Sequence, residues 1–168
     1  MKQIEDLVFS RETNRNTFLE MLEVLDLRQP LLIKPNWGTS ICFTEAKILD
    51  WTLDSVDGDA LVVESYGWSR TKDMLEKGKL GSKKRGDLRR SDEWFMDYSG
   101  VGKVLDKYKV EFLNITEEQW AHRTMEPETI KDEVESIYSP VSDPDFYSWM
   151  PQRLYDMRGA DLLSLSKL

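Results

Sequence analysis

Residues 31–40 read Leu-Leu-Ile-Lys-Pro-Asn-Trp-Gly-Thr-Ser, and this stretch decides the fold. Its three apolar residues follow a proline and are too few for a helix, so they predict a short buried strand. The proline after Lys34 holds that residue in extended geometry, and the strand then gives way to a polar loop. An amine, an amide, two hydroxyls and a glycine backbone gather there just before a new helix. An α/β domain usually binds its ligand at such a point.

The residues after this loop predict a parallel crossover. Apolar residues recur at helical spacing between residues 46 and 56, and we expect Thr44 to cap this helix. Residues 60–63 are a second unbroken apolar run and predict a second buried strand. Two such strands joined by one helix favour a right-handed parallel connection.

The alternation of helices and strands continues along the chain. We expect a helix at 17–27 that starts with a capping box of Thr17 and Glu20, and a helix at 101–108 capped by Ser99. The remaining expected elements are strands at 110–115 and 161–168 and a helix at 151–157. Residues 1–168 are therefore expected to form a single α/β domain. Its core would be a layered, mostly parallel sheet of about four strands flanked by helices.

Two charged segments interrupt this pattern. Residues 72–90 hold eight lysines or arginines, three acidic residues and three glycines, so we expect an exposed, mobile basic loop. Residues 116–147 are acidic and contain three prolines, and we expect mostly loop there. Within it, the sequence predicts a helix from Glu128 to Glu135 and a short strand at Ile137 and Tyr138.

Composition excludes several classes of protein. The formal net charge of −8 repels polyanions, which argues against nucleic acid or anionic lipid as a partner. Cys42 is the one cysteine, and we expect a buried structural thiol in a reducing compartment, the cytoplasm. His122 is the one histidine and is expected at the surface, so ligand count excludes zinc and we expect no metal site. No stretch has the length and apolarity of a signal peptide or a membrane span, so we expect no membrane partner.

Parallel strands would bring polar side chains to one edge of the sheet, at the carboxyl ends of the strands. There we expect Lys34 to anchor an anionic small molecule, and Asn36 and Thr39 to orient it. Glu64 is the candidate catalytic acid or base, or a magnesium ligand through waters. The other candidate ligand-binding residues are Gly38, Ser40, Ser65 and Lys167, and the polar residues expected beside them are Asn114, Thr116 and Ser166.

The same residues have a structural interpretation that stays open. Asn36 and Thr39 could satisfy backbone groups of their own loop, while Lys34 is merely solvated. Gly38, Thr39 and Ser40 lack the full phosphate-loop pattern, which argues against a nucleoside triphosphatase.

An alternative function is a noncatalytic interaction module. The basic residues Lys83, Lys84 and Arg85, flanked by Trp68 and Trp94, could hold a protein or RNA partner through residues 72–90. Aromatic residues near the end of the chain are expected to pack in the core, or to form an interface with a protein partner or a second copy. They are Phe146, Tyr147, Trp149 and Tyr155.

Several of these motifs together resemble the family called domain of unknown function 362. They are Lys34-Pro35-Asn36 after an apolar strand, the crossover to Val62-Val63-Glu64-Ser65, and the unit from Ser99-Gly100 to Glu111. The resemblance covers about residues 31–115 and returns at 164–168.

This resemblance implies an α/β domain, which in some members carries an iron–sulfur ferredoxin module, and it suggests a redox-associated ligand. Family members continue past the strand similar to residues 163–168, so the resemblance also implies that this chain is half of a larger domain. With one cysteine the chain cannot supply an iron–sulfur cluster by itself. The resemblance names no reaction, so whether the chain is an enzyme stays open.

Overall fold

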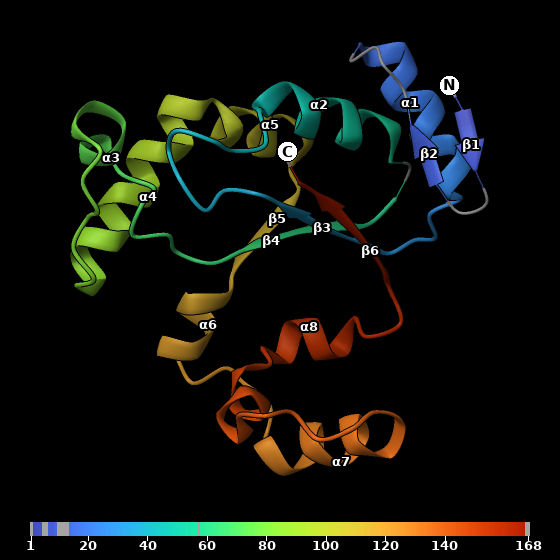
Figure 1. Cartoon of the computed structure of the whole chain (residues 1–168), viewed down its shortest axis with the longest axis vertical. Helices are drawn as coiled ribbons and strands as arrows, with labels where there is room; N and C mark the ends of the chain where they lie inside the picture. The colour runs from blue at the N-terminus through green and yellow to red at the C-terminus, as the bar shows by residue number, and fades with distance from the viewer. Residues whose placement is uncertain (1, 5–6, 10–13, 57, 167–168) are drawn as a thin grey trace.

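A four-stranded sheet lies at the centre of the computed structural model, which describes residues 2–4, 7–9, 14–56 and 58–166 (Figure 1). Its strands stand in the order β5, β4, β3, β6, and all neighbouring strands pair in parallel. They are β3 Leu31–Pro35, β4 Ala60–Glu64, β5 Glu111–Asn114 and β6 Asp161–Leu165. The four strands expected for this sheet are present, which confirms the α/β fold class.

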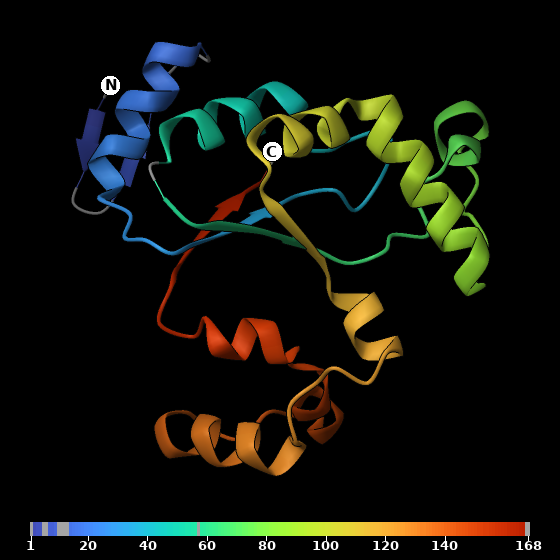
Figure 2. The same cartoon turned by 180° about the vertical axis from the view of Figure 1, so that it is seen from behind.

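Helices cover both faces of the sheet (Figures 1 and 2). On one face lie α1 Arg15–Leu25, α2 Ala46–Ser55, α4 Arg85–Ser99 and α5 Val101–Tyr108. On the other lie α6 Ile115–Trp120, α7 Pro127–Ile137, the 3-10 helix η1 Pro144–Trp149 and α8 Gln152–Asp156. The remaining elements are the short α3 Lys72–Lys77, beside α4, and a hairpin of β1 Lys2–Ile4 and β2 Leu7–Phe9, beside α1.

The larger core fills the space between the sheet and the helices α2, α4 and α5. Leu31, Ile33 and Val62 of the central strands are completely buried against Leu49 of α2 and Val101 of α5. Each such side chain contributes about 1.5–3 kcal/mol by leaving water. A second, smaller core on the opposite face explains why these strands do not alternate between apolar and polar residues.

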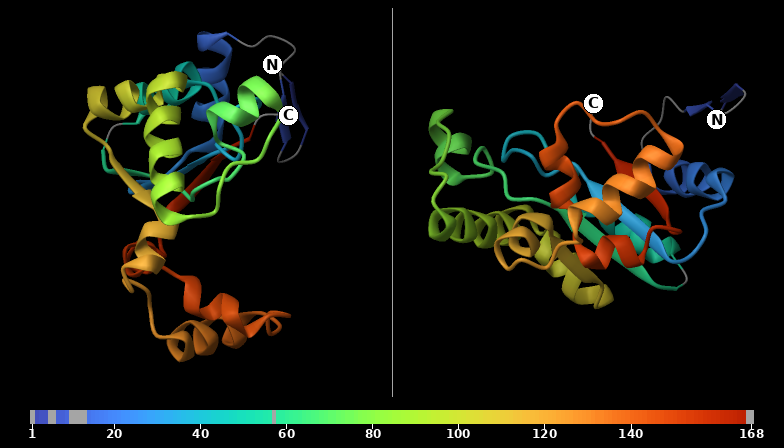
Figure 3. Two further views of the ribbon diagram at one scale, coloured as in Figure 1. Left: turned by 90° about the vertical axis from the view of Figure 1, so that its left-hand side faces the viewer. Right: turned by 90° about the horizontal axis from the view of Figure 1, so that it is seen from below.

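This second core is centred on one half of the sheet. Leu61, Val63 and Leu113 of β4 and β5 pack there against Met157, just beyond α8. The half formed by β3 and β6 is less covered, and Leu162 of β6 is 58% exposed. Figure 3 shows α7 and α8 on the face of the sheet that carries the second core, with α7 farther from the sheet than α8.

The three predicted helix caps are wrong. Helix α5 begins at Val101 with Gly100 at its cap position, because Ser99 is the last residue of α4. Helix α1 begins at Arg15, because Asn14 caps it by accepting a hydrogen bond from the Thr17 N–H, so Thr17 lies inside the helix. Helix α2 begins at Ala46 without a cap from Thr44. The Thr44 hydroxyl instead accepts a hydrogen bond from the Asn36 N–H at 2.9 Å and donates one to the Leu165 carbonyl. Thr44 thus ties the loop after β3 to the end of β6.

The prediction of a loop at residues 72–90 is also wrong, since most of the segment is helical. Thr71 caps α3 by accepting a hydrogen bond from the Met74 N–H, and Gly78 ends this helix with a φ of 65°. Gly78 and Gly81 therefore lie between two helices, and Gly86 lies inside the second one, α4. Ion pairs one turn apart, such as Lys77 with Asp73 at 2.8 Å, stabilise the exposed α3, whereas α4 also packs into the core through Phe95.

Residues 116–147 contain more helix than expected, in α6, α7 and η1. The predicted strand at Ile137 and Tyr138 is absent, because Ile137 is the last residue of α7.

Cys42 is exposed, so the prediction of a buried thiol is wrong, whereas His122 lies at the surface as expected. The loop that holds Cys42 lies on the surface, where its neighbour Ile41 is 63% exposed. No helix among the described residues combines the length and apolar composition needed to cross a bilayer.

Candidate functional site

The parallel sheet gathers several of the predicted site residues at one edge. The register pairs Lys34 of β3 with Ser164 of β6, and Glu64 of β4 with Asn114 of β5, so all four lie at the carboxyl ends of their strands. The Lys34 ammonium lies 3.6 Å from the Glu64 carboxylate. The expected meeting of Lys34 and Glu64 is therefore present.

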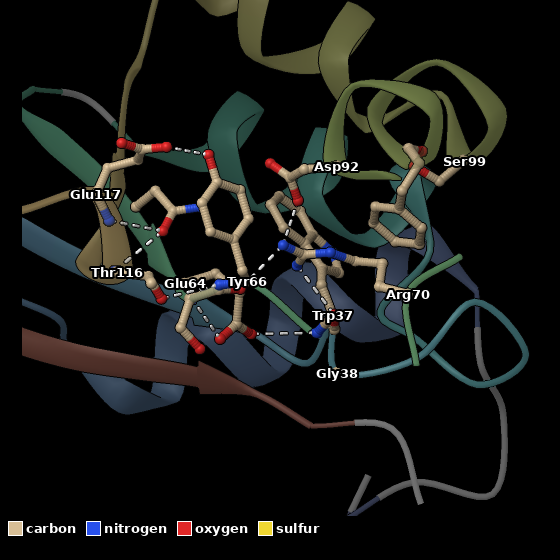
Figure 4. Close-up of polar contacts among 12 residues, drawn as sticks. Trp37, Gly38, Glu64, Tyr66, Arg70, Asp92, Ser99, Thr116 and Glu117 are labelled. Carbon is tan, nitrogen blue, oxygen red and sulfur yellow. Dashed lines mark hydrogen bonds and ion pairs between the residues drawn. The ribbon is translucent and has the colours of Figure 1, made fainter. Parts of the chain in front are cut away.

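Glu64 is buried and connects the loops that follow β3 and β4. Its carboxylate accepts hydrogen bonds from the Trp37 N–H at 3.2 Å and from the Ser65 N–H at 2.9 Å, as Figure 4 shows. Charge-assisted bonds of this kind are about twice as strong as neutral ones. Glu64 thus fixes the shape of the polar edge.

The donors of Thr39 and Ser40 are engaged within the protein. The Thr39 hydroxyl donates to the Ser69 carbonyl at 3.3 Å, and the Ser40 hydroxyl donates to the Thr71 carbonyl at 2.8 Å while lying 3.3 Å from that of Ser69. In return, the Ser69 hydroxyl donates to the Gly38 carbonyl at 2.6 Å. These bonds tie the loop after β3 to the loop after β4, and they favour the structural interpretation for residues 38–40.

Other donors at this edge are not engaged. The Asn36 side chain and the Ser65 hydroxyl make no hydrogen bond within the described ranges, and Lys34 has Glu64 as its one ion-pair partner there. Asn114 is buried, and its side-chain oxygen accepts from the N–H groups of Thr116, at 3.0 Å, and Glu117, at 3.4 Å. Its amide nitrogen is the one buried side-chain polar atom without a partner in the described part of the chain.

The orientation of the Asn114 amide is fixed by this capping contact. Turning the amide over would place its NH₂ group against the two backbone N–H groups that begin α6. The Nδ2 atom therefore remains a buried donor with two unused hydrogens. An unpaired buried donor costs about 1–3 kcal/mol of folding free energy. A ligand atom that accepts a hydrogen bond from Nδ2 would recover part of this cost and would therefore bind favourably.

A buried arginine supports the same two loops, and sequence reasoning missed it. Arg70 is 1% exposed and donates to the carbonyls of Trp37, at 3.0 Å, and Ser65, at 2.9 Å (Figure 4). Its guanidinium also pairs with Asp92 of α4 and lies over the Phe95 ring, 5.2 Å from the ring centroid. Burial raises the pKa of Asp92, against the opposing effect of Arg70. A single arginine in a polar loop carries no periodic signal, so nothing in the sequence marked it as buried.

A second cluster lies where β5 meets α6. The Glu117 carboxylate accepts hydrogen bonds from the Tyr66 hydroxyl at 2.6 Å and from the Arg89 guanidinium at 2.6 and 2.7 Å. The hydrogen bond from Arg89 is the main cause that lowers the pKa of Glu117 to about 2. Desolvation, followed by the contact with Glu117, raises the pKa of Tyr66. Glu117 is thus a strongly held anion that connects α6 to α4.

The last two residues predicted at this edge, Ser166 and Lys167, follow β6 in the sequence. Ser166 is exposed, and its hydroxyl lies 3.4 Å from that of Ser164, whereas Lys167 lies outside the described residues. Within the described ranges, no group of three or more histidine, cysteine or acidic side chains is arranged to hold a metal ion.

Two surface hollows lie at the opposite edge of the sheet, where the strands begin. One is lined by Gln29, Leu31 and residues of α1, and the other by Ala60, Glu111 and residues near α8. Neither includes Lys34, Glu64 or Asn114. We place the candidate site at the carboxyl edge, because the unengaged donors lie at this edge and ligands of parallel sheets bind there.

The chain matches no protein-family model, no curated protein and no solved structure. The resemblance to domain of unknown function 362 thus stays a prediction from the residues that carry it.

Proposed function

We propose that the carboxyl edge of the sheet binds an anionic small molecule. Lys34 is the electrostatic anchor, and Asn36, Ser65 and the Nδ2 atom of Asn114 donate hydrogen bonds to the ligand. The observation that carries the proposal is the buried, unpartnered Nδ2 atom of Asn114, on the strand position paired with Glu64. A ligand oxygen there would satisfy this donor, whereas a purely structural edge would leave it unpaired.

In this proposal Glu64 is a positioning residue. Its carboxylate is committed to the Trp37 and Ser65 N–H groups, so it holds the loops that frame the ligand. The Lys34 side chain is about half exposed, and its ammonium can turn from Glu64 toward an anion. Each carboxylate oxygen of Glu64 accepts one of these N–H groups and keeps a second lone pair for a proton, a water or a cation.

The broader identity of the chain is part of the same proposal. We infer that it is related to the domain of unknown function 362 family, acts in the cytoplasm and takes a metabolite or redox-associated ligand. The support is the Lys34-Pro35-Asn36 motif at the end of β3, which stands on the edge with the unengaged donors.

Thermal unfolding with inorganic phosphate or citrate tests the site, with sodium chloride of equal ionic strength as the reference. The wild-type melting temperature should rise by about 2–4 °C at saturating anion, because binding to the folded state alone stabilises it. Lys34→Met keeps the aliphatic stem and should lose most of this rise. Lys103→Met is the matched control, since Lys103 is an exposed lysine on α5, away from the edge.

Asn114→Ser separates ligand binding from folding. Serine caps helices as well as asparagine does, so this variant retains an acceptor for the first N–H groups of α6 while it removes Nδ2. It should keep the wild-type melting temperature within a few degrees and lose the anion-dependent rise. An equal rise in wild type, Lys34→Met and Asn114→Ser would show that the anions act elsewhere, and the proposed site would then be wrong.

A further inference from the structure

Residues 79–85 together with Trp68 form a surface that we call the basic surface. The segment 79–85 contains four cationic residues and no acidic residue. Among the described residues, no carboxylate forms an ion pair with any of these four, in contrast to the neighbouring Lys77, Arg89 and Arg90. The four are Lys79, Lys83, Lys84 and Arg85.

Two indole rings hold part of this charge in place. The Lys83 ammonium lies 3.5 Å from the centroid of the Trp68 ring, and the Arg85 guanidinium lies 4.9 Å from that of Trp120. Trp120 in turn packs against Tyr66, with ring centroids 5.4 Å apart. Such contacts position a cation without neutralising it. The basic surface also has apolar area, because Leu80 is 65% exposed and Trp68 is 45% exposed.

Residues 126–145 together with Phe146 and Trp149 form what we call the acidic surface, on α7 and η1. The segment 126–145 contains seven acidic residues and one lysine, and none of the seven forms an ion pair in the described part of the chain. Two of them, Glu133 and Glu135, accept hydrogen bonds from tyrosine hydroxyls, which leaves their charge intact. The other five are Glu126, Glu128, Asp132, Asp143 and Asp145.

The acidic surface has the same mixture of charge and exposed apolar side chains. Ile137 and Tyr138 are 74% and 69% exposed, and Phe146 and Trp149 are about half exposed. The rings of Phe146 and Trp149 pack edge to face, 5.1 Å apart. The surfaces lie apart in one molecule: α3 and the start of α4 flank the sheet, whereas α7 lies at the far end (Figures 1 and 2).

We propose that the basic surface of one copy binds the acidic surface of a second copy. Complementary charge on the two surfaces, combined with exposed apolar area on both, is the pattern of a protein interface. A nucleic acid would neutralise the cations, but the net charge of −8 repels it, and it offers little to cover Leu80. This proposal is independent of the anion site at the carboxyl edge.

The pairing has a definite symmetry. Each copy uses two different surfaces, so the contact is heterologous, and a bound pair still presents one free surface of each kind. Further copies can therefore add, and they form either an open chain or a closed ring. A twofold dimer would instead use both surfaces at once in a reciprocal contact.

Two neutralised variants test this arrangement by sedimentation velocity on the full chain. The first carries Lys83→Gln, Lys84→Gln and Arg85→Gln, which removes charge from the basic surface. The second carries Glu128→Gln, Asp132→Asn and Asp145→Asn, which removes charge from the acidic surface and leaves the Asp143 cap of η1 in place. Far-ultraviolet circular dichroism and thermal melts establish that both variants fold.

Wild type should associate with increasing concentration up to about 500 μM, and association should weaken about tenfold between 0.1 and 0.5 M salt. Each variant alone should be monomeric. An equimolar mixture should form a species of two chains and nothing larger, because only one intact surface of each kind is present.

Several results would overturn the proposal. They are a monomeric wild type throughout this concentration range, a variant that associates like wild type, or a mixture that contains monomers alone. A wild type that stops at two chains would also contradict it, because a reciprocal dimer leaves no free surface for a third copy. If an oligothymidylate bound wild type and not the first variant while the chain stayed monomeric, the basic surface would serve a nucleic acid instead.

Discussion

The backbone N–H of Trp37, in the loop after β3, donates a hydrogen bond to the carboxylate of Glu64, at the end of β4. The two residues come from neighbouring strands joined by a crossover helix, so this bond fixes one loop against the other. Arg70 reinforces it by donating to the carbonyls of Trp37 and Ser65. The polar edge of the sheet is therefore rigidly framed before any ligand binds.

Replacing Glu64 should destabilise the chain. Glu64→Ala leaves the buried Trp37 and Ser65 N–H groups without an acceptor and should cost about 2–4 kcal/mol in the free energy of unfolding. Glu64→Gln keeps one acceptor and should cost about half as much. Urea denaturation followed by tryptophan fluorescence measures both, with Glu20→Gln on the exposed surface of α1 as control. Equal, small effects at positions 64 and 20 would contradict the role assigned to Glu64.

The close approach of the two loops makes a second prediction at Gly67. A Cβ atom on this residue would lie 2.7 Å from the Gly38 carbonyl oxygen, a backbone atom that cannot move aside cheaply. Gly67→Ala should therefore lower the free energy of unfolding by about 1–3 kcal/mol. Gly159→Ala is the matched control, because nothing lies within 4 Å of its Cβ position. The control should be neutral or slightly stabilising; the same loss in both variants would show that the contact at Gly67 is unimportant.

The buried pair of Arg70 and Asp92 should show strong coupling. Arg70→Met leaves the carboxylate of Asp92 without its cation and should cost about 3–5 kcal/mol. Combining it with Asp92→Leu should cost at least about 1 kcal/mol less than the sum of the single changes. Arg90→Met removes an exposed pair with Asp87 and should cost under about 1 kcal/mol. Strictly additive losses in the double variant would mean that Arg70 and Asp92 contribute independently to the free energy of unfolding.

Acid should weaken the attachment of α6 to α4. The pKa of Glu117 is about 2 in the folded chain and 4.5 ordinarily, so its contribution is complete above about pH 5 and is lost as the pH falls toward 2. We expect about 1–2 kcal/mol from this group after solvent screening. Asp92 acts in the opposite direction, because its folded-state pKa is raised.

Urea midpoints between about pH 2 and pH 6 measure this dependence. Glu117→Gln should be less stable than wild type at pH 6, and the two should converge as the pH falls. Two parallel curves would show that Glu117 does not contribute to the acid response.

The strands could be predicted because parallel strands covered on both faces consist of short apolar runs, as in Leu31 to Ile33 and Ala60 to Val63. Their order could not, since β6 pairs with β3 through contacts that no local pattern encodes. Helix α3 and the first turns of α4 could not be predicted from apolar periodicity, because α3 depends on exposed ion pairs and the Thr71 cap and the buried Phe95 of α4 lies beyond residue 90.

Part of the candidate site could also be predicted from the sequence, and part could not. Lys34 and Glu64 could be placed together, because parallel strands end at a common edge. The hydroxyls of Thr39 and Ser40 looked available, but the loop after β4, whose course the sequence does not specify, engages them. Asn114 was named only as a neighbour, and its unpartnered amide depends on which of its atoms caps α6.

The position of β6 affects how the protein forms during its synthesis on the ribosome. Residues 161–165 insert beside β3, which is made about 130 residues earlier, so Leu31 and Ile33 lack one neighbouring strand until translation reaches Asp161. Until then, the nascent chain presents an open apolar edge to other nascent chains and to chaperones. A ribosome that stalls before Asp161 would therefore leave an aggregation-prone product, although most of the helices would already have been made.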